Sequence, residues 1–446
     1  MNISTFGVAR VIMLLLTMIL LILNYFGNDV NFIGVVVLFL YLLIIFYYKP
    51  IEFANNLLFF IILIPMLIGG ALIERGVYLF EIDKYTYWNG TFLVNLFFSM
   101  IFIEFLIYPI KSTNQKNIFK VNRLFIEGLI VLAILVLYGT FLKTGVPLFS
   151  GIHRTVYFGS IVPDYVNLIK GRLSFACLVL GYYYFRFKSK RYIAYYVLII
   201  AYHILCSIKG GELLIILYTF YLPITLYYTS TLTEEKKKTL YRKIRTALCL
   251  LISGVFFIIF INFQTVENYD SGTTALEKIE KRVEAAGQIW WVINDENQVL
   301  NTIRWDKFIR NFEESDNILD KGMNQLMTEV VPADILNVWR APDARGRSLA
   351  NGFPAIGFYY FGYSGVIVFL VIIGFVIILI KKDILASFRS GDVLAFLFIG
   401  PILELIIRVV AQGDINLFFE KRTYAIIIAY ILYGIIKSLM IRPKIQ

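Results

Sequence analysis

Long, nearly uninterrupted runs of apolar residues recur along the chain and are separated by short polar stretches. About a dozen runs approach or exceed ~18 residues, the length that a helix needs to cross the hydrocarbon core of a bilayer. They cover residues 8–26, 31–48, 55–73, 91–109, 124–142, 172–187, 191–207, 211–229, 246–263, 353–380, 392–411 and 422–440. Continuous runs favour helices, because a β-barrel alternates apolar and polar positions. The pattern predicts an all-α polytopic membrane protein with about 12 transmembrane helices.

Basic residues in the short loops predict the orientation. They cluster after the fourth, sixth, eighth and tenth runs, within 111–123, 186–191, 236–245 and 381–389. By the positive-inside rule these loops face the cytoplasm, which also places both chain termini there. The first run lacks a small-residue cleavage site and is expected to be a membrane helix, not a signal peptide.

Two connections are long and are expected on the outer side. We divide the chain into residues 1–263 (nine helices, with the outer loop 143–171), residues 264–352 (a large outer loop) and residues 353–446 (three helices and a cytoplasmic tail). In the large loop, Leu276 to Ile293 has apolar residues at helical spacing and predicts an amphipathic helix. Trp290, Trp291, Trp305 and Trp339 are expected either in an interfacial aromatic belt or in the core of this loop.

Composition excludes several classes of protein. Hydrophobic residues make up 59% of the chain and charged residues 16%, against about 25% charged residues in a soluble domain. The net charge of +11 is largely explained by the loop asymmetry, so we expect no nucleic-acid partner. The 3 cysteines lie in apolar runs and only 2 histidines occur, which argues against a disulfide framework and against a metal site or other cofactor.

Candidate chemistry lies in the cations of the outer loops. His153 and Arg154 occupy the first long loop and Arg172 ends it, while Arg345 and Arg347 precede a span. An arginine fork binds phosphate oxygens through two hydrogen bonds and stays charged when partly buried. Such a set suits a lipid that carries a diphosphate. The alternative is a solvated loop held by salt bridges.

Charges at or within the spans add to this set. Lys209 and Glu212 flank a glycine pair at an outer hairpin tip, and Arg408, Asp414 and Arg422 surround the last outer turn. A charge in hydrocarbon costs roughly 2.5–3.5 kcal/mol on insertion scales, so each one is a candidate functional residue. The alternative is local pairing, of Lys209 with Glu212 and of Glu404 with Arg408.

Three stretches carry a resemblance to a known family: Ser207 to Glu212, Val331 to Gly357, and Arg408 to Arg422. Together with the extended outer loops, they resemble the Wzy-type polymerases, which join O-antigen and related polysaccharide repeat units in bacterial inner membranes. The chain departs from that pattern at the hairpin tip, where Lys209 and Glu212 stand in place of the usual arginine.

The resemblance implies an inverting, metal-independent glycosyltransferase of the GT-C type. Its donor would be a glycan on undecaprenyl pyrophosphate, its acceptor a lipid-linked repeat unit, and a chain-length regulator its possible partner. The expected diphosphate-binding residues are Arg154, Arg172, Lys209, Arg345, Arg347, Arg408 and Arg422. Glu212, His153 and Asp414 are the candidate bases, with Glu212 preferred because it opens a span.

Two other functions remain open at this stage. A flippase for lipid-linked oligosaccharides also has many spans and intramembrane charges, but it has short loops and two similar halves. A membrane acyltransferase would need histidine-centred motifs, and His203 alone is thin support. Loss of a polymerase leaves single-unit polysaccharide, loss of a flippase leaves none, and loss of an acyltransferase leaves full-length unmodified chains.

Overall fold

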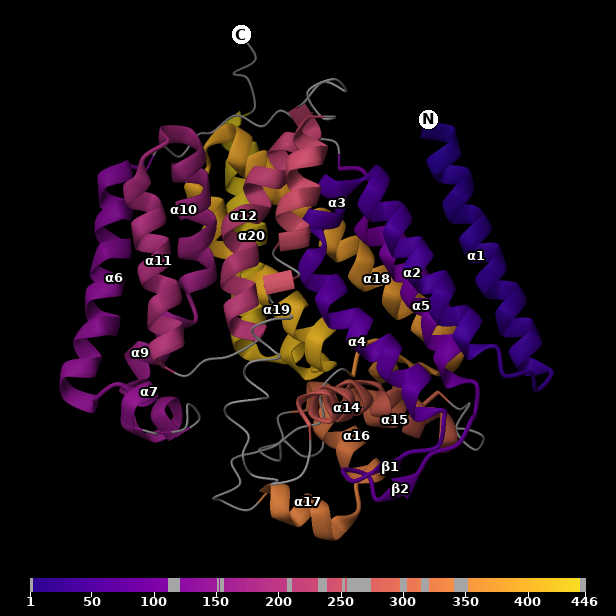
Figure 1. Ribbon diagram of the computed structural model, residues 1–446. Coiled ribbons are helices and arrows are strands. Elements are labelled where there is room, and N and C mark those ends of the chain that lie inside the picture. Colours follow the sequence, from indigo (N-terminus) through magenta and orange to yellow (C-terminus); the bar gives the residue numbers. More distant parts are fainter. Residues whose placement is uncertain are drawn as a thin grey trace. The chain divides into compact units, whose positions relative to one another are not determined.

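A computed structural model describes residues 3–110, 121–150, 152, 156–206, 211–231, 239–250, 253–254, 274–296, 303–313, 321–340 and 352–441. These residues are mainly helical, with one short antiparallel hairpin (Figure 1). The chain forms two compact units, which are described separately. Unit 1 comprises Met1–Tyr108, Leu232–Phe375 and Arg408–Phe419, and unit 2 comprises Pro109–Thr231, Val376–Ile407 and Glu420–Gln446.

Unit 1 contains the N-terminal helices and the described parts of the large loop. Its elements are α1 (Ile3–Tyr25), α2 (Asn31–Tyr48), α3 (Pro50–Asn55), α4 (Leu57–Ile73), β1 (Tyr78–Leu79), β2 (Lys84–Tyr85), α5 (Thr91–Leu106), α14 (Ala275–Glu296), α15 (Trp305–Ile309), η2 (Arg310–Phe312), α16 (Gly322–Val330), α17 (Ala333–Arg340) and η4 (Ile415–Phe419). The first part of α18 (Ala355–Ser390) also belongs to it. Helix α14 confirms the amphipathic helix predicted at Leu276 to Ile293.

A glycine-to-glycine contact lets α14 cross α4 at close range. A Cβ atom at Gly69 would lie 2.0 Å from the carbonyl oxygen of Val283, and one at Gly287 would lie 2.3 Å from the backbone nitrogen of Gly70. Contacts this short exclude any side chain larger than hydrogen unless the backbone moves. The three glycines therefore bind the amphipathic helix of the large loop to the membrane helices of unit 1.

The tryptophan pair of α14 lies in the core of unit 1 and not in an exposed belt. Trp290 and Trp291 are each 1% exposed. Trp290 stacks on Phe98 and Phe358, at ring-centroid distances of 6.3 and 6.2 Å, and the indole nitrogen of Trp291 donates to the Tyr87 carbonyl at 2.9 Å. Trp305, in contrast, is 56% exposed. The Trp339 side chain lies outside the described residues.

Helix α18 bends at Gly362, whose φ of 66° and ψ of −168° are outside the helical range. Only glycine adopts this region without strain. Gly365, three residues after the bend, must also be glycine, because a Cβ atom there would lie 1.8 Å from the Cβ atom of Phe361. The short segment before the bend consequently packs with the loop helices, and the longer segment after it continues as a long apolar helix.

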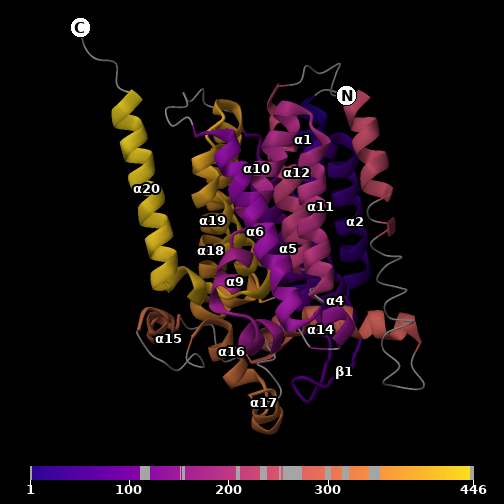
Figure 2. The same cartoon turned by 90° about the vertical axis from the view of Figure 1, so that its left-hand side faces the viewer.

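Unit 2 contains the helices of the middle and the end of the chain. Its elements are α6 (Arg123–Thr144), α7 (Pro147–Ser150), η1 (Tyr157–Ile161), α9 (Asp164–Lys170), α10 (Leu173–Phe187), α11 (Lys190–Leu205), α12 (Gly211–Thr231), most of α19 (Val393–Gln412) and α20 (Lys421–Ile441). Helices α10 and α12 pack tightly, because a Cβ atom at Gly181 would lie 2.2 Å from the Phe220 carbonyl oxygen. The rotated view of Figure 2 shows α10, α11 and α12 running side by side.

The number of membrane spans differs from the prediction. Among the described residues, seven helices are long and apolar enough to span a bilayer, not about twelve. They are Phe6–Tyr25, Asn31–Tyr48, Arg123–Ser150, Glu212–Thr231, Ala355–Ser390, Val393–Gln412 and Lys421–Met440. Four other predicted spans form shorter helices, of 17, 16, 15 and 16 residues in α4, α5, α10 and α11. The ninth predicted span, 246–263, lies largely outside the described residues.

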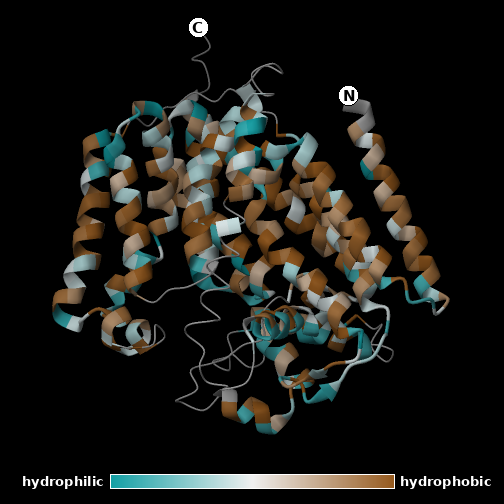
Figure 3. Cartoon of the chain, in the orientation of Figure 1, coloured by the Kyte–Doolittle hydropathy of each residue, from teal (hydrophilic) through white to brown (hydrophobic). Residues whose placement is uncertain are grey.

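The surfaces of the long helices confirm a multi-pass membrane protein. Apolar residues cover them, whereas hydrophilic residues gather along α14 and the β1–β2 hairpin (Figure 3). Several charges on the described apolar helices are paired, as burial in hydrocarbon favours. In unit 1, Glu104 accepts from Arg10 at 2.7 Å and from the Tyr41 hydroxyl at 2.6 Å.

Candidate functional site

The candidate site in unit 2 begins at the turn between α9 and α10. Lys170 ends α9, Gly171 follows, and Arg172 directly precedes α10. The backbone nitrogens of Gly171 and Arg172 donate to Asn167 and Ile169 at 2.9 Å each, which closes α9, and the Arg172 carbonyl accepts from Ala176 as α10 starts. Two cations are thereby presented on one tight turn at the end of an apolar helix.

Arg422, in the first turn of α20, approaches this turn from a distant part of the sequence. A Cβ atom at Gly171 would lie 3.7 Å from Nη2 of Arg422, so the guanidinium is within contact distance of the backbone. Burial and then the positive charge of Arg422 lower the pKa of Arg172, while the carboxylate of Glu404 acts in the opposite direction. The Arg172 guanidinium therefore lies in the electrostatic field of a second guanidinium, that of Arg422, and of the Glu404 carboxylate.

Helix α19 supplies that carboxylate through a close contact with α10. A Cβ atom at Gly400 would lie 3.0 Å from the Cα of Phe175, so the two backbones nearly touch. Residues four apart share a helix face, and Glu404 therefore follows Gly400 toward the α9–α10 turn. The absence of a side chain at Gly400 thus contributes to placing Glu404 near Arg172.

Lys170 is directed to a second carboxylate. Its ammonium lies 2.8 Å from the carboxylate of Glu212, in the first turn of α12, and 4.2 Å from the ring centroid of Phe158. The charge of Lys170 is thus balanced by Glu212, while Arg172 lies in the fields of both Arg422 and Glu404. An anion with several oxygen atoms, such as a phosphate or diphosphate, is the ligand that complements a pair of guanidinium groups.

The predicted site residues fall into three groups. Arg172, Glu212 and Arg422 lie at the described site in unit 2, while Arg408 and Asp414 belong to unit 1. His153, Arg154, Lys209, Arg345 and Arg347 lie outside the described residues. His203 is 2% exposed and its Nδ1 lies 2.8 Å from the Ile199 carbonyl, so it is a packed residue of α11.

Two of the stretches that carry the family resemblance meet within unit 1. A Cβ atom at Gly413 would lie 2.9 Å from the Cα of Gly352, and one at Gly352 would lie 2.8 Å from the Gln412 carbonyl oxygen. Gly413 has a φ of 80°, and Asp414 follows it, where its carbonyl accepts from Leu417 at 3.2 Å. Asp414 is therefore fixed beside the start of α18, at a contact that tolerates only glycine.

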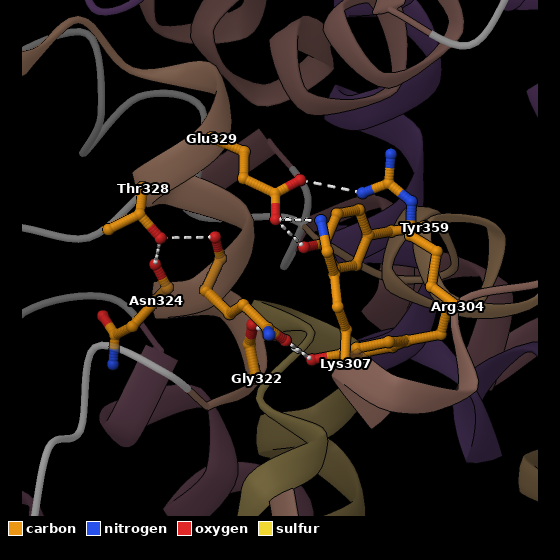
Figure 4. Close-up of polar contacts among 9 residues, drawn as sticks. Arg304, Lys307, Gly322, Asn324, Thr328, Glu329 and Tyr359 are labelled. Atoms are coloured by element: carbon orange, nitrogen blue, oxygen red, sulfur yellow. Dashed lines mark hydrogen bonds and ion pairs between the residues drawn. The ribbon is translucent and has the colours of Figure 1, made fainter. Parts of the chain in front are cut away.

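A further polar cluster in unit 1 centres on Glu329 and was not predicted from the sequence. Its carboxylate accepts hydrogen bonds from Arg304 at 2.8 Å, from the Tyr359 hydroxyl at 2.7 Å, and from Lys307 (Figure 4). The three donors come from the segment before α15, from α15 and from α18. The sequence offered one signal for this cluster, namely two cations three residues apart, Arg304 and Lys307. It did not indicate their common partner, because Glu329 lies more than 20 residues further along the chain.

The electrostatics of Glu329 indicate a structural carboxylate. Partial burial raises its pKa, but the hydrogen bonds from Lys307 and Tyr359 and the charges of Lys307 and Arg304 outweigh that effect and leave the pKa below its usual value. A general base needs a pKa near the working pH. Glu329 is thus better suited to holding α15, α16 and α18 together than to accepting a proton.

Comparison of the sequence with protein families found a match to a family of unknown function. The match to this family (DUF6418) comprises residues 316–436, which covers α16 to most of α20. No curated protein and no solved structure matches the chain. The matched region includes Glu329, the contact between Gly352 and Gly413, and both Glu404 and Arg422.

Proposed function

We propose that this protein is a Wzy-type polymerase, which joins undecaprenyl-pyrophosphate-linked oligosaccharides into O-antigen or a related surface polysaccharide. It is a multi-pass protein of the bacterial inner membrane with a GT-C-like fold and both termini in the cytoplasm. The observation that supports it best is the pair Arg172 and Arg422, whose charges converge with Glu404 at the end of apolar helices. A diphosphate carried on a membrane-embedded polyprenol lies at the membrane surface, so cations at the ends of membrane helices, such as Arg172 and Arg422, are placed to bind it.

The proposed reaction needs little beyond positioning and charge. A hydroxyl of the lipid-linked acceptor unit attacks the anomeric carbon of the donor glycan, and a new C–O bond forms there. The bond from that carbon to the diphosphate oxygen breaks, and undecaprenyl pyrophosphate leaves with the electron pair. Arg172 and Arg422 stabilise the charge that develops on this leaving group. Arg408 and the cations of the outer loops stay candidates for diphosphate binding on the grounds of their residue type and their positions in the sequence.

The acceptor proton must pass to a base as the hydroxyl attacks. Glu212 is the preferred base because it begins α12 beside Lys170, and the other candidates are His153 and Asp414. The enzyme uses no metal or other cofactor, since the leaving group is already an activated diphosphate. A chain-length regulator is the proposed protein partner.

The experiment is complementation of a deletion strain at matched expression, scored as surface-polysaccharide ladders on gels. Arg172→Ala and Arg422→Ala are expected to leave single-unit polysaccharide, and the lysine variants at both positions to restore part of the ladder. Lys421→Ala is the matched control, one residue from Arg422, and should keep the ladder. Normal ladders in both alanine variants would contradict the site.

The deletion strain itself tests the function. Single-unit polysaccharide supports a polymerase. Complete loss of the polysaccharide would indicate a flippase, and full-length chains that lack a substituent would indicate an acyltransferase.

A further inference from the structure

Helix α15 and the turn η2 that continues it present three distinct faces to their surroundings. Positions 304, 308 and 311 form one face, positions 305, 309 and 312 a second, and positions 306, 310 and 313 a third, each with the spacing of one helix side. In Figure 2, this segment lies at the same end of unit 1 as α16 and α17. Each face differs in chemistry and in exposure.

The first face is fixed to unit 1 at each of its three positions. Arg304 is 8% exposed and bonds to Glu329, and its backbone nitrogen donates to the Tyr360 carbonyl at 2.8 Å. Phe308 packs on Phe361 at a centroid distance of 4.8 Å. Asn311 is 3% exposed and accepts from the backbone nitrogen of Gly322 at 2.8 Å. The orientation of the segment is therefore set by the protein.

The second face is apolar and about half exposed, although the Phe312 ring also packs on Phe419 at a centroid distance of 4.1 Å. Trp305, Ile309 and Phe312 are 56%, 51% and 54% exposed, and Ile303, just before them, is 54% exposed. The third face carries Asp306, Arg310 and Glu313, all exposed and of both signs. An outward apolar stripe beside a polar stripe is the pattern of a helix that lies in the plane of a membrane interface.

The apolar stripe adjoins the lipid-facing surface of a membrane helix. The ring centroid of Trp305 lies 5.4 Å from that of Phe361, the residue just before the bend of α18. Beyond the bend, α18 exposes Ile367, Val368 and Ile372, which are 42%, 59% and 54% exposed, and it is one of the helices that can span a bilayer. The apolar surface thus continues from the span onto the loop segment.

We propose that residues 303–312 form a bilayer anchor of the large loop, with Trp305, Ile309 and Phe312 inserted at the boundary between phospholipid headgroups and acyl chains. Asp306, Arg310 and Glu313 face the water. The occupant is lipid because the stripe is continuous with a lipid-facing helix, and because tryptophan concentrates at this depth. The mixed charge of the polar face makes the insertion depend on apolar contact and not on anionic lipids. This inference does not depend on the polymerase proposal.

The test uses the full-length chain in lipid nanodiscs with spin labels on single introduced cysteines. Cys249 is exposed and is first changed to serine, whereas Cys177 and Cys206 are buried and do not label. Ile309→Cys reports the apolar face, and the neighbouring Arg310→Cys is the matched control on the polar face. For each label, two collision rates are measured and compared: the rate with molecular oxygen, which partitions into lipid, and the rate with a water-soluble nickel complex.

The label at position 309 is expected to collide several-fold more with oxygen than with the nickel complex, and the label at position 310 to show the reverse order. This difference should persist in nanodiscs of purely zwitterionic lipid. Equal exposure of both labels to the nickel complex would overturn the proposal. A label at position 309 that is immobile and shielded from both reagents would also overturn it, because a protein surface would then cover the stripe.

Discussion

The ammonium of Lys170 lies 2.8 Å from the carboxylate of Glu212 and joins the end of α9 to the first turn of α12. The Lys170 and Glu212 side chains are 20% and 37% exposed, so water still reaches the pair. Exposed ion pairs contribute only about 0–1 kcal/mol to stability. The pair therefore matters more for the direction in which the Glu212 carboxylate points than for the stability of the fold.

The first prediction separates a catalytic from a structural role of Glu212. Glu212→Gln is expected to abolish the polysaccharide ladder with little loss of protein, because an amide cannot take the acceptor proton. The double exchange Lys170→Glu with Glu212→Lys keeps opposite charges at the two positions but removes the carboxylate from position 212. It should match wild-type expression and still make no ladder. A ladder in the double exchange would show that Glu212 serves only as the partner of Lys170.

Apolar patterning located the helices but overestimated the number of spans. Eleven of the twelve predicted runs coincide with described helices, because burial in lipid needs continuous apolar residues and leaves a strong signal. Helix length is less visible in sequence, since capping and turns decide it. Helix α10, for example, ends at Phe187 because Lys188 adopts a left-handed conformation, with a φ of 52°.

Residue type predicted candidate cations, but long-range geometry decided their grouping. Arg172 and Arg422 were both predicted, yet their neighbour Glu404 was considered as an internal partner of Arg408. Its effect on Arg172 depends on the contact between Gly400 and Phe175, which no local pattern encodes. Glu329 was missed for the same reason, since its partners Arg304 and Tyr359 lie 25 residues before and 30 residues after it.

The second prediction concerns the crossing of α4 and α14. Gly287→Ala places a methyl group 2.3 Å from the Gly70 nitrogen, so the helices must separate. Overpacking of this kind costs typically about 1–3 kcal/mol and should lower the midpoint of thermal unfolding in detergent. Gly139→Ala is the control, because nothing lies within 4 Å of a Cβ atom there and alanine favours a helix by roughly 0.5–1 kcal/mol. An equal response of both variants would contradict the tight crossing.

The third prediction follows from the depressed pKa of Glu329. Because the folded state favours the ionised carboxylate, its contribution to stability is present above the pKa of an unfolded glutamate, about 4.3, and is lost as pH falls through the lower folded value. Glu329→Gln should therefore reduce the unfolding midpoint at pH 7 and have a smaller effect near pH 3.5. Midpoints of both proteins are compared across this range. A difference that does not change with pH would exclude the ionic contacts to Arg304 and Lys307.

The last prediction concerns Glu74, which is 5% exposed at the end of α4. Its carboxylate accepts hydrogen bonds from the Asn31 side chain and from the backbone nitrogen of Phe92, the latter at 3.2 Å. Burial nevertheless raises the pKa of Glu74 to about 7, although both hydrogen bonds oppose the rise. The folded state consequently prefers the protonated acid.

The sign of the pH dependence is opposite to that of Glu329. The stability associated with protonated Glu74 is complete below the unfolded pKa, about 4.3, and is lost as pH rises toward the folded value of about 7. A shift of this size corresponds to on the order of 3 kcal/mol. Unfolding midpoints of the wild type should fall relative to those of Glu74→Gln between pH 5 and pH 7.5 and level off above that range. The exposed Glu313→Gln is the control, and a wild-type profile parallel to that of Glu74→Gln would show that Glu74 is ionised throughout.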